Sequence, residues 1–298
     1  KKFGLKLIAV DDADDPDDRV FIDGKLLDEK AAKELEDEVE KTLTALTQTA
    51  AWINADEPWK SPNAARLDRR TMRDWIDAQK CSPKVQWYLS LLFGGENGTA
   101  VEAQSFLANL APIKGGGLAK FWTDSETHRC LGGNQQLAGK LAETIGEKRI
   151  LLSTPVKSIV QNSGRCVVHA VDGKRFVCDD VVLAIPPSVW SSVTLDPALP
   201  FEGHPQMGVA VKWLARVDGR FWSEEEISSN ALTNGDLNAT WEGTKGQPGD
   251  GEAGLVGFSG GLAARDILRR EPKAREEWYR REMQTRSEEH TSELQSPC

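Results

Sequence analysis

The stretch GGNQQLAGKLAETIGEKRILLSTPVKSIV, residues 132–160, indicates the fold class most directly. It predicts a helix that Gly146 closes, because glycine is the common residue just past a helix end. The apolar residues 150–153 follow, and 155–160 is typical of a strand. A helix that leads into strands in this way predicts an α/β fold.

Downstream residues extend this pattern of strands. The segments 166–171 and 175–178 are predicted strands joined by Asp172-Gly173, a two-residue hairpin signal. The run VVLAIPP, 181–187, is continuously apolar, which is typical of a buried parallel strand. A further strand is predicted over 208–217.

The first half of the chain predicts helices. Residues 28–54 have apolar side chains three and four positions apart, as in an amphipathic helix that covers a core. Shorter helices are predicted over 71–78, 83–93 and 101–110, with GGENG, 94–98, as a loop. One more helix is predicted from Gly260 to about Met283.

Composition excludes several classes of protein. The 298 residues are 39% hydrophobic and carry a formal net charge of −9, which argues against a nucleic-acid binder. The longest apolar runs are far shorter than the roughly 20 residues of a membrane span. The five cysteines lack paired spacing, so no disulfide framework is expected. The four histidines, His128, His169, His204 and His290, suggest no metal site.

Lys212 is the charged residue that the strand pattern singles out. Alternation along 208–217 places Lys212 on one face with Gly208, Ala210 and Leu214, opposite Val211 and Trp213. A lysine that shares a face with alanine and leucine is expected to be partly buried or at a cavity wall. The alternative is a side chain that snorkels from a half-exposed strand to water.

Two glycine motifs match known fingerprints only in part. Residues 249–254 match GxGxxG, but a polar loop precedes them and a strand follows, whereas a dinucleotide site needs the strand before and a helix after. Residues 257–261 match GxSxG in a strand-to-helix context. An α/β-hydrolase esterase with Ser259 as nucleophile is therefore an alternative, and a turn of small residues is the simpler interpretation.

Both ends of the sequence are unusual. RSEEHTSELQSP, 286–297, matches an in-frame translation of a common sequencing-adapter oligonucleotide, so we expect 286–298 to be an artefact. The chain starts without Met or a signal peptide, so secretion cannot be judged from it, and a cytoplasmic location is favoured.

Four segments, in this order, resemble the flavin-containing amine oxidase family, which includes monoamine, polyamine and L-amino-acid oxidases. They are DEPWKSPNAARLDRRTMRDWI, 56–76; CLGGNQQLAGKLAETIGEKRILLSTPVKSIVQ, 130–161; DDVVLAIPPSVWSSVTLDPALP, 179–200; and MGVAVKWLARVDGRFW, 207–222. The similarity is spread over about 1–285 and is most specific over 130–222.

The resemblance implies a Rossmann-like, FAD-binding domain interrupted by a substrate domain of mixed sheet and helices. Residues 1–10 and 132–203 would be flavin-domain segments. Residues 11–131 would form the helical part of the substrate domain, and 204–285 its sheet part. Both the family's strand–GxGxxG–helix and its C-terminal flavin segment are absent, so we expect a fragment that lacks both termini.

The resemblance also implies the cofactor and the site. FAD would oxidise an amine to an imine, which hydrolyses to an aldehyde or keto product, while O₂ is reduced to hydrogen peroxide. Lys212 would hold a water against the flavin; Val156, Ala184 and Pro186 would lie at the cofactor's adenosine half. Glu126 would line the substrate cavity. We expect the 298-residue chain alone to bind FAD poorly and to be inactive; a non-catalytic flavin-fold protein is a further alternative.

Overall fold

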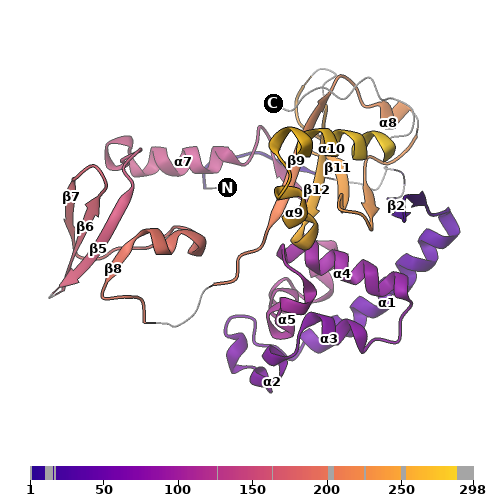
Figure 1. Ribbon diagram of the computed structural model, residues 1–298, viewed down its shortest axis with the longest axis horizontal. Helices are drawn as coiled ribbons and strands as arrows, with labels where there is room; N and C mark the ends of the chain where they lie inside the picture. Colours follow the sequence, from indigo (N-terminus) through magenta and orange to yellow (C-terminus); the bar gives the residue numbers. More distant parts are fainter. Residues whose placement is uncertain are drawn as a thin grey trace. The chain divides into compact units, whose positions relative to one another are not determined.

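The computed structural model of the chain is shown in Figure 1. It describes residues 2–10, 16, 18–125, 127–162, 164–200, 205–224, 226–249 and 253–286. The chain forms two compact units: unit 1 comprises Lys1–Gly4 and Asn134–Met207, and unit 2 comprises Leu5–Gly133 and Gly208–Cys298. Helices and open sheets occur in both units, which confirms the α/β class.

Unit 1 consists of one amphipathic helix and a small sheet. Helix α7, Gln135–Ile145, ends at Gly146, whose φ of 89° requires glycine. The sheet has the order β7-β6-β5-β8. Its strands are β5 (Val156–Asn162), β6 (Arg165–Ala170), β7 (Arg175–Cys178) and β8 (Thr194–Asp196), with β8 parallel to β5. The 3₁₀ helices of unit 1 are η3, Glu147–Arg149, and η4, Pro187–Ser192.

The expected buried strand over 181–187 is wrong for this structure. Residues 180–186 form no strand, and the sheet of unit 1 does not include them. Val182 is 88% exposed and Ile185 is 38% exposed. An apolar run becomes a buried strand only when neighbouring strands accept its hydrogen bonds and cover its faces, and the described residues of unit 1 provide no such neighbours.

Unit 2 contains a six-stranded sheet in the order β3-β2-β10-β11-β12-β9. β2 and β10 are parallel, and the other neighbours are antiparallel. The strands are β2 (Arg19–Ile22), β3 (Lys25–Leu26), β9 (Ala210–Val217), β10 (Ala231–Thr233), β11 (Ala239–Glu242) and β12 (Ala253–Gly260). A separate pair joins β1, Leu7–Ala9, to β4, His128–Cys130.

The helical half of unit 2 has its own core. Helix α1, Glu29–Ala50, begins at Asp28, which caps it by accepting from the Ala31 amide. Its predicted apolar stripe packs inward, with Leu46 and Ala50 fully buried. The surrounding elements are η1 (Pro58–Lys60), α2 (Ala64–Arg69), α3 (Met72–Asp77), α4 (Pro83–Asn97), η2 (Val101–Ala103), α5 (Phe106–Gly115) and α6 (Ala119–Thr123).

Three predicted helical stretches differ from the structure, and one of them, 101–110, is the 3₁₀ helix η2 followed by α5, which continues to Gly115. The expected loop 94–98 is wrong, because α4 continues through Asn97 and ends at Gly98 in the left-handed region. Glycines usually weaken a helix, but here they allow close packing of its last turn against strands. The single helix expected over 260–283 is two helices, α9, Gly261–Leu268, and α10, Pro272–Arg286, because Pro272 starts a new helix.

The second core of unit 2 lies on one face of the large sheet. Helix α10 runs across the strands (Figure 1), and its Tyr279 stacks on Trp213 of β9 at 5.9 Å between ring centroids. Ala215 and Val217 of the same strand are also buried there. Helix α8, Phe221–Glu224, adds Phe221 and Trp222 to this core. The opposite face of β9 therefore remains available for a site.

The described residues contain neither a candidate membrane-spanning helix nor a candidate metal-binding cluster. No helix in this part of the chain has the length and apolar composition needed to cross a bilayer. The same part contains no cluster of three or more histidine, cysteine or acidic side chains placed to hold a metal ion. Most of the aspartate-rich segment 11–18, the centre of the 249–254 motif and residues 287–298 lie outside the described residues.

Candidate active site

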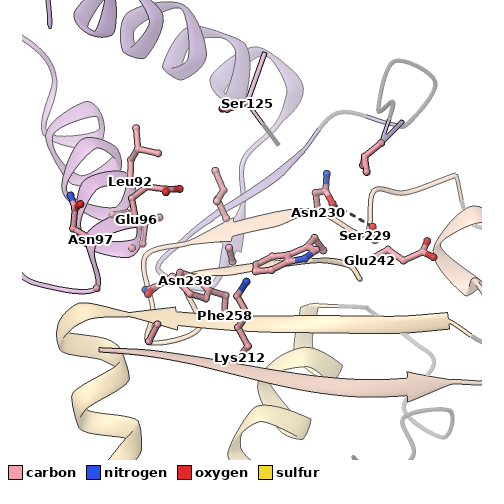
Figure 2. Close-up of a pocket in the computed structure, with 18 of the residues that line it drawn as sticks. Leu92, Glu96, Asn97, Ser125, Lys212, Ser229, Asn230, Asn238, Glu242 and Phe258 are labelled. Atoms are coloured by element: carbon pink, nitrogen blue, oxygen red, sulfur yellow. Dashed lines mark hydrogen bonds between the residues drawn. The ribbon is translucent and has the colours of Figure 1, made fainter. Parts of the chain in front are cut away.

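A cavity of about 900 Å³ lies within unit 2, on the face of the sheet that the α10 core leaves open. Its floor comes from β9, β11 and β12, and its opposite wall from the end of α4 (Figure 2). The side chains and main chain that line it include Tyr88, Leu92, Glu96, Gly98, Arg129, Gly208, Lys212, Asn230, Asn238, Trp241, Lys245 and Phe258.

Lys212 stands on the floor of this cavity. The alternation of β9 buries Trp213 and directs Lys212 to the other face, toward the cavity (Figure 2). Its Nζ lies 5.1 Å from the centroid of the Trp241 ring and 5.9 Å from that of Phe258. Within the described part of the chain it has neither an ion-pair partner nor a hydrogen-bond acceptor. The ammonium is therefore oriented by two aromatic rings and left open to a ligand.

The end of α4 forms the facing wall. Leu92 and Glu96 point over the sheet, whereas Asn97 points away from it (Figure 2). The Asn97 amide hydrogen-bonds to the side-chain oxygens of Gln104 and Asn109, at 2.8 and 3.0 Å. Gln104 in turn donates to the carbonyl of Thr99. This buried network fixes the last turn of α4, and with it the position of the wall.

The wall and the floor meet at two glycines. The amide of Val209 donates to the Gly98 carbonyl at 2.6 Å. A Cβ at Gly208 would lie 2.5 Å from the Asn97 carbonyl oxygen, and one at Gly98 would lie 2.7 Å from the Val209 nitrogen. Only glycine permits backbones to approach this closely. The glycines of 94–98 therefore serve packing at the mouth of the site.

The charged groups that line the cavity differ in their partners. Glu242 is 6% exposed, and Arg220 binds its carboxylate with Nη2 at 2.8 Å; the Thr244 hydroxyl donates to the same oxygen at 2.9 Å. Arg129 instead donates from Nη1 to the main-chain carbonyl of Glu242 at 3.0 Å. Burial, and next the charges of Asp18 and Glu36, raise the pKa of the Tyr88 phenol, so this wall residue stays protonated.

The other predicted site residues lie elsewhere. Val156 begins β5 in unit 1 and is 37% exposed. Ala184 and Pro186 are exposed on the irregular segment that precedes η4 of the same unit. None of the three lines the cavity of unit 2. Glu126 lies outside the described residues, although its neighbours Ser125 and Thr127 line the cavity.

Ser259 has a structural role rather than an exposed, reactive hydroxyl. It is fully buried at the end of β12. Its Oγ donates to the Asp236 carbonyl at 2.6 Å and accepts from the Tyr279 hydroxyl at 2.8 Å. A nucleophile must present its oxygen to a substrate, so this geometry gives the esterase alternative no support.

Sequence reasoning did not find most of the cavity wall. Arg129, Trp241 and Asn238 were not singled out, because each lies in a short strand or loop whose pattern is weak. Arg129 directly precedes the segment 130–161, whose resemblance was noted, but no pattern marked the arginine itself. Lys212 was found because β9 is long enough to show alternation.

Comparisons with known proteins identify the family to which the chain is similar. A family model described as flavin containing amine oxidoreductase matches residues 1–289. A probable flavin-containing monoamine oxidase A of Dictyostelium discoideum is 26% identical over 249 residues, which cover 79% of this chain and 53% of that protein. Putrescine oxidase of Kocuria rosea is 26% identical over 245 residues, 74% of this chain and 50% of that protein.

The fold comparison covers more of the chain. A structure of wild-type putrescine oxidase bound to putrescine superimposes with a TM-score of 0.80 over 95% of this chain and 66% of that one, at 21% identity. At this identity the likeness concerns the fold. The chain spans about half the length of the two curated relatives named above.

Proposed function

The chain belongs to the flavin-containing amine oxidoreductase family, and from this membership we propose that it takes part in FAD-dependent oxidation of an amine. The amine would lose two electrons and two hydrogens, one from its α-carbon and one from its nitrogen, to give an imine. Water would hydrolyse the imine to an aldehyde or keto product and release ammonia. O₂ would take up the two electrons and two protons as hydrogen peroxide.

One observation carries this proposal beyond family membership. Lys212 presents an ammonium to a cavity of about 900 Å³, and among the described residues it has two aromatic contacts but no ion-pair or hydrogen-bond partner. That volume lies in the range of small-molecule sites. The lysine stands on the strand that resembles the family's lysine-bearing strand, which supports a role for it at the reacting end of the site.

Residues of the chain fit parts of the cofactor. The segment that carries Ala184 and Pro186 is irregular and exposed, with apolar neighbours such as Val182, 88% exposed. An exposed apolar surface suits an adenine ring, so we assign Val156, Ala184 and Pro186 to the adenosine half of FAD. Unit 1 would then be flavin-domain sequence and unit 2 the substrate domain.

When bound, FAD supplies the redox chemistry that no side chain can supply. The chain's own residues position and desolvate the amine. Trp241 and Phe258 supply apolar surface around Lys212, and Leu92 supplies it from the facing wall. Lys212 would donate a hydrogen bond to a water or to oxygen at its Nζ, held in place by the two rings.

The test is peroxide release from the protein made from the complete reading frame that encodes this chain. We expect flavin absorbance in the purified protein and peroxide with one or more members of a panel of primary amines, diamines and amino acids. Lys212→Met should lower turnover at least tenfold, in line with the loss of a positioned proton donor. Lys84→Met, at an exposed lysine on α4 away from the cavity, is the matched control.

Other outcomes would favour the alternatives. Unchanged turnover in Lys212→Met would remove the lysine's role. Bound flavin without turnover on any amine would indicate a non-catalytic flavin-fold protein. Hydrolysis of a p-nitrophenyl ester without flavin, abolished by Ser259→Ala, would indicate an esterase.

A further inference from the structure

We propose that the cavity binds a carboxylate through Arg129, so that the amine oxidised is one that also carries a carboxylate. The assignment of the ligand as an oxidisable amine rests on the proposed function. The anion site itself rests on the charges of the cavity wall.

Most N–H donors of the Arg129 side chain have no partner among the described residues. A guanidinium has five N–H donors. Arg129 uses one of them on the Glu242 main-chain carbonyl, at 3.0 Å. Within the described part of the chain, no carboxylate lies within ion-pair distance of it. The remaining donors belong to a side chain that lines the cavity and is neither buried nor fully exposed.

The described acidic residues that line the cavity, Glu242 and Glu96, form no ion pair with Arg129. The Glu242 carboxylate is committed to Arg220 and to the Thr244 hydroxyl. Arg129 reaches only the main chain of that residue. Glu96, on the facing wall, has interactions of its own.

A second cation, Lys212, also contacts strand β11. Lys212 stands over the ring of Trp241, and Arg129 contacts the carbonyl of the next residue, Glu242. The two cations therefore flank one short stretch of β11. A ligand that brings a second ammonium to this region would be repelled by both charges, whereas a carboxylate would be attracted by both.

The geometry of the arginine also favours a carboxylate. A guanidinium matches two carboxylate oxygens with parallel N–H bonds, and such charge-assisted pairs are about twice as strong as neutral hydrogen bonds. The bond from Nη1 to the Glu242 carbonyl, at 3.0 Å, tethers the guanidinium at the cavity. A neutral amide would lose the charge and one acceptor, so it should bind this site much less tightly.

The test measures binding of small probes to the 298-residue chain by calorimetry, without flavin or turnover. Phenylacetate carries the carboxylate, phenylacetamide is its neutral analogue, and phenethylamine carries an amine alone. We expect phenylacetate to bind at least about tenfold more tightly than phenylacetamide. Added sodium chloride should weaken phenylacetate binding and leave phenylacetamide binding unchanged.

Variants locate the site. Arg129→Gln should abolish the preference for phenylacetate. Arg129→Lys should keep part of this preference, because lysine retains the positive charge but cannot donate two parallel N–H bonds to a carboxylate. Arg269→Gln, at an arginine that is 79% exposed in its side chain on the surface of unit 2, should leave the preference unchanged. The comparison of probes on the unaltered chain stands even if Arg129→Gln fails to fold.

The results separate this inference from the proposed function. Equal binding of phenylacetate and phenylacetamide, or no binding of phenylacetate at all, overturns the carboxylate site whatever the peroxide assay shows. A preference that persists in Arg129→Gln overturns the assignment to Arg129. If phenylacetate binds through Arg129 and no amine yields peroxide, the anion site stands and the oxidase proposal fails.

Discussion

The Nζ of Lys212 lies 5.1 Å from the centre of the Trp241 ring, although the two residues come from strands that are not neighbours in the sheet. Strand β12 separates β9 from β11, and its Phe258 is paired with Lys212 in the register. The Lys212 side chain therefore extends across β12, and its ammonium lies over the Trp241 ring of β11. This contact fixes the direction of the ammonium without neutralising it.

Replacing Lys212 should change the site and leave the fold intact. In Lys212→Met we expect the free energy of unfolding to change by less than about 1 kcal/mol, because only a cation–π contact is lost. Urea denaturation followed by tryptophan fluorescence checks this. A loss of more than about 2 kcal/mol would indicate that the lysine serves stability.

The glycine at the wall–floor junction should tolerate no side chain. Gly208→Ala places a methyl group 2.5 Å from a main-chain oxygen, so we expect a loss of about 1–3 kcal/mol in the free energy of unfolding. Gly219→Ala is the matched control, since a Cβ there meets no atom within 4 Å. Equal urea midpoints for the two variants would contradict the close approach.

The buried hydroxyl pair should contribute stability and no esterase activity. Ser259→Ala leaves the Tyr279 hydroxyl without its acceptor, which should cost about 1–3 kcal/mol. Tyr279→Phe should cost less, about 1 kcal/mol, because Ser259 still donates to Asp236. The double variant should cost less than the sum of the two. Additive losses would show that the pair does not interact.

The cap of α3 should make stability depend on acid pH. The amide and hydroxyl of Thr71 lower the pKa of Asp74 below its ordinary value of 3.8. A lowered folded-state pKa adds stability above the ordinary value, which is lost as the pH falls through 3.8 toward the lowered value. The difference in stability between the wild type and Asp74→Asn should therefore shrink in that range. Urea denaturation across acid pH measures it, and a difference independent of pH would contradict the capping box.

Much of the fold could be predicted from local patterns. Helix α1 and strand β9 are both long, and each buries one face. The spacing of apolar residues in the sequence therefore shows the helical period in α1 and the two-residue period in β9. The structure of the segment 181–187 was not predictable in the same way. Its apolar run favours burial, but the segment becomes a buried strand only where neighbouring strands pair with it. The extension of α4 through 94–97 depended on a tertiary contact, the approach of Gly98 to Val209.

The site was predictable only in part. Lys212 could be singled out because charge on an apolar face is unusual in a sequence. Arg129 and Trp241 could not, since they lie on β4 and β11, strands that are far apart in the chain and belong to different sheets. The assignment of Val156, Ala184 and Pro186 stays a prediction.

The stacking of Trp213 on Tyr279 also protects the orientation of the neighbouring lysine. A shift of β9 by one residue would turn Trp213 toward water and Lys212 into the core of α10. Such a shift would destabilise the fold, so selection would remove it whether or not it also changed a reaction. Natural variation in this strand should therefore accept exchanges of side chains and avoid single-residue insertions and deletions.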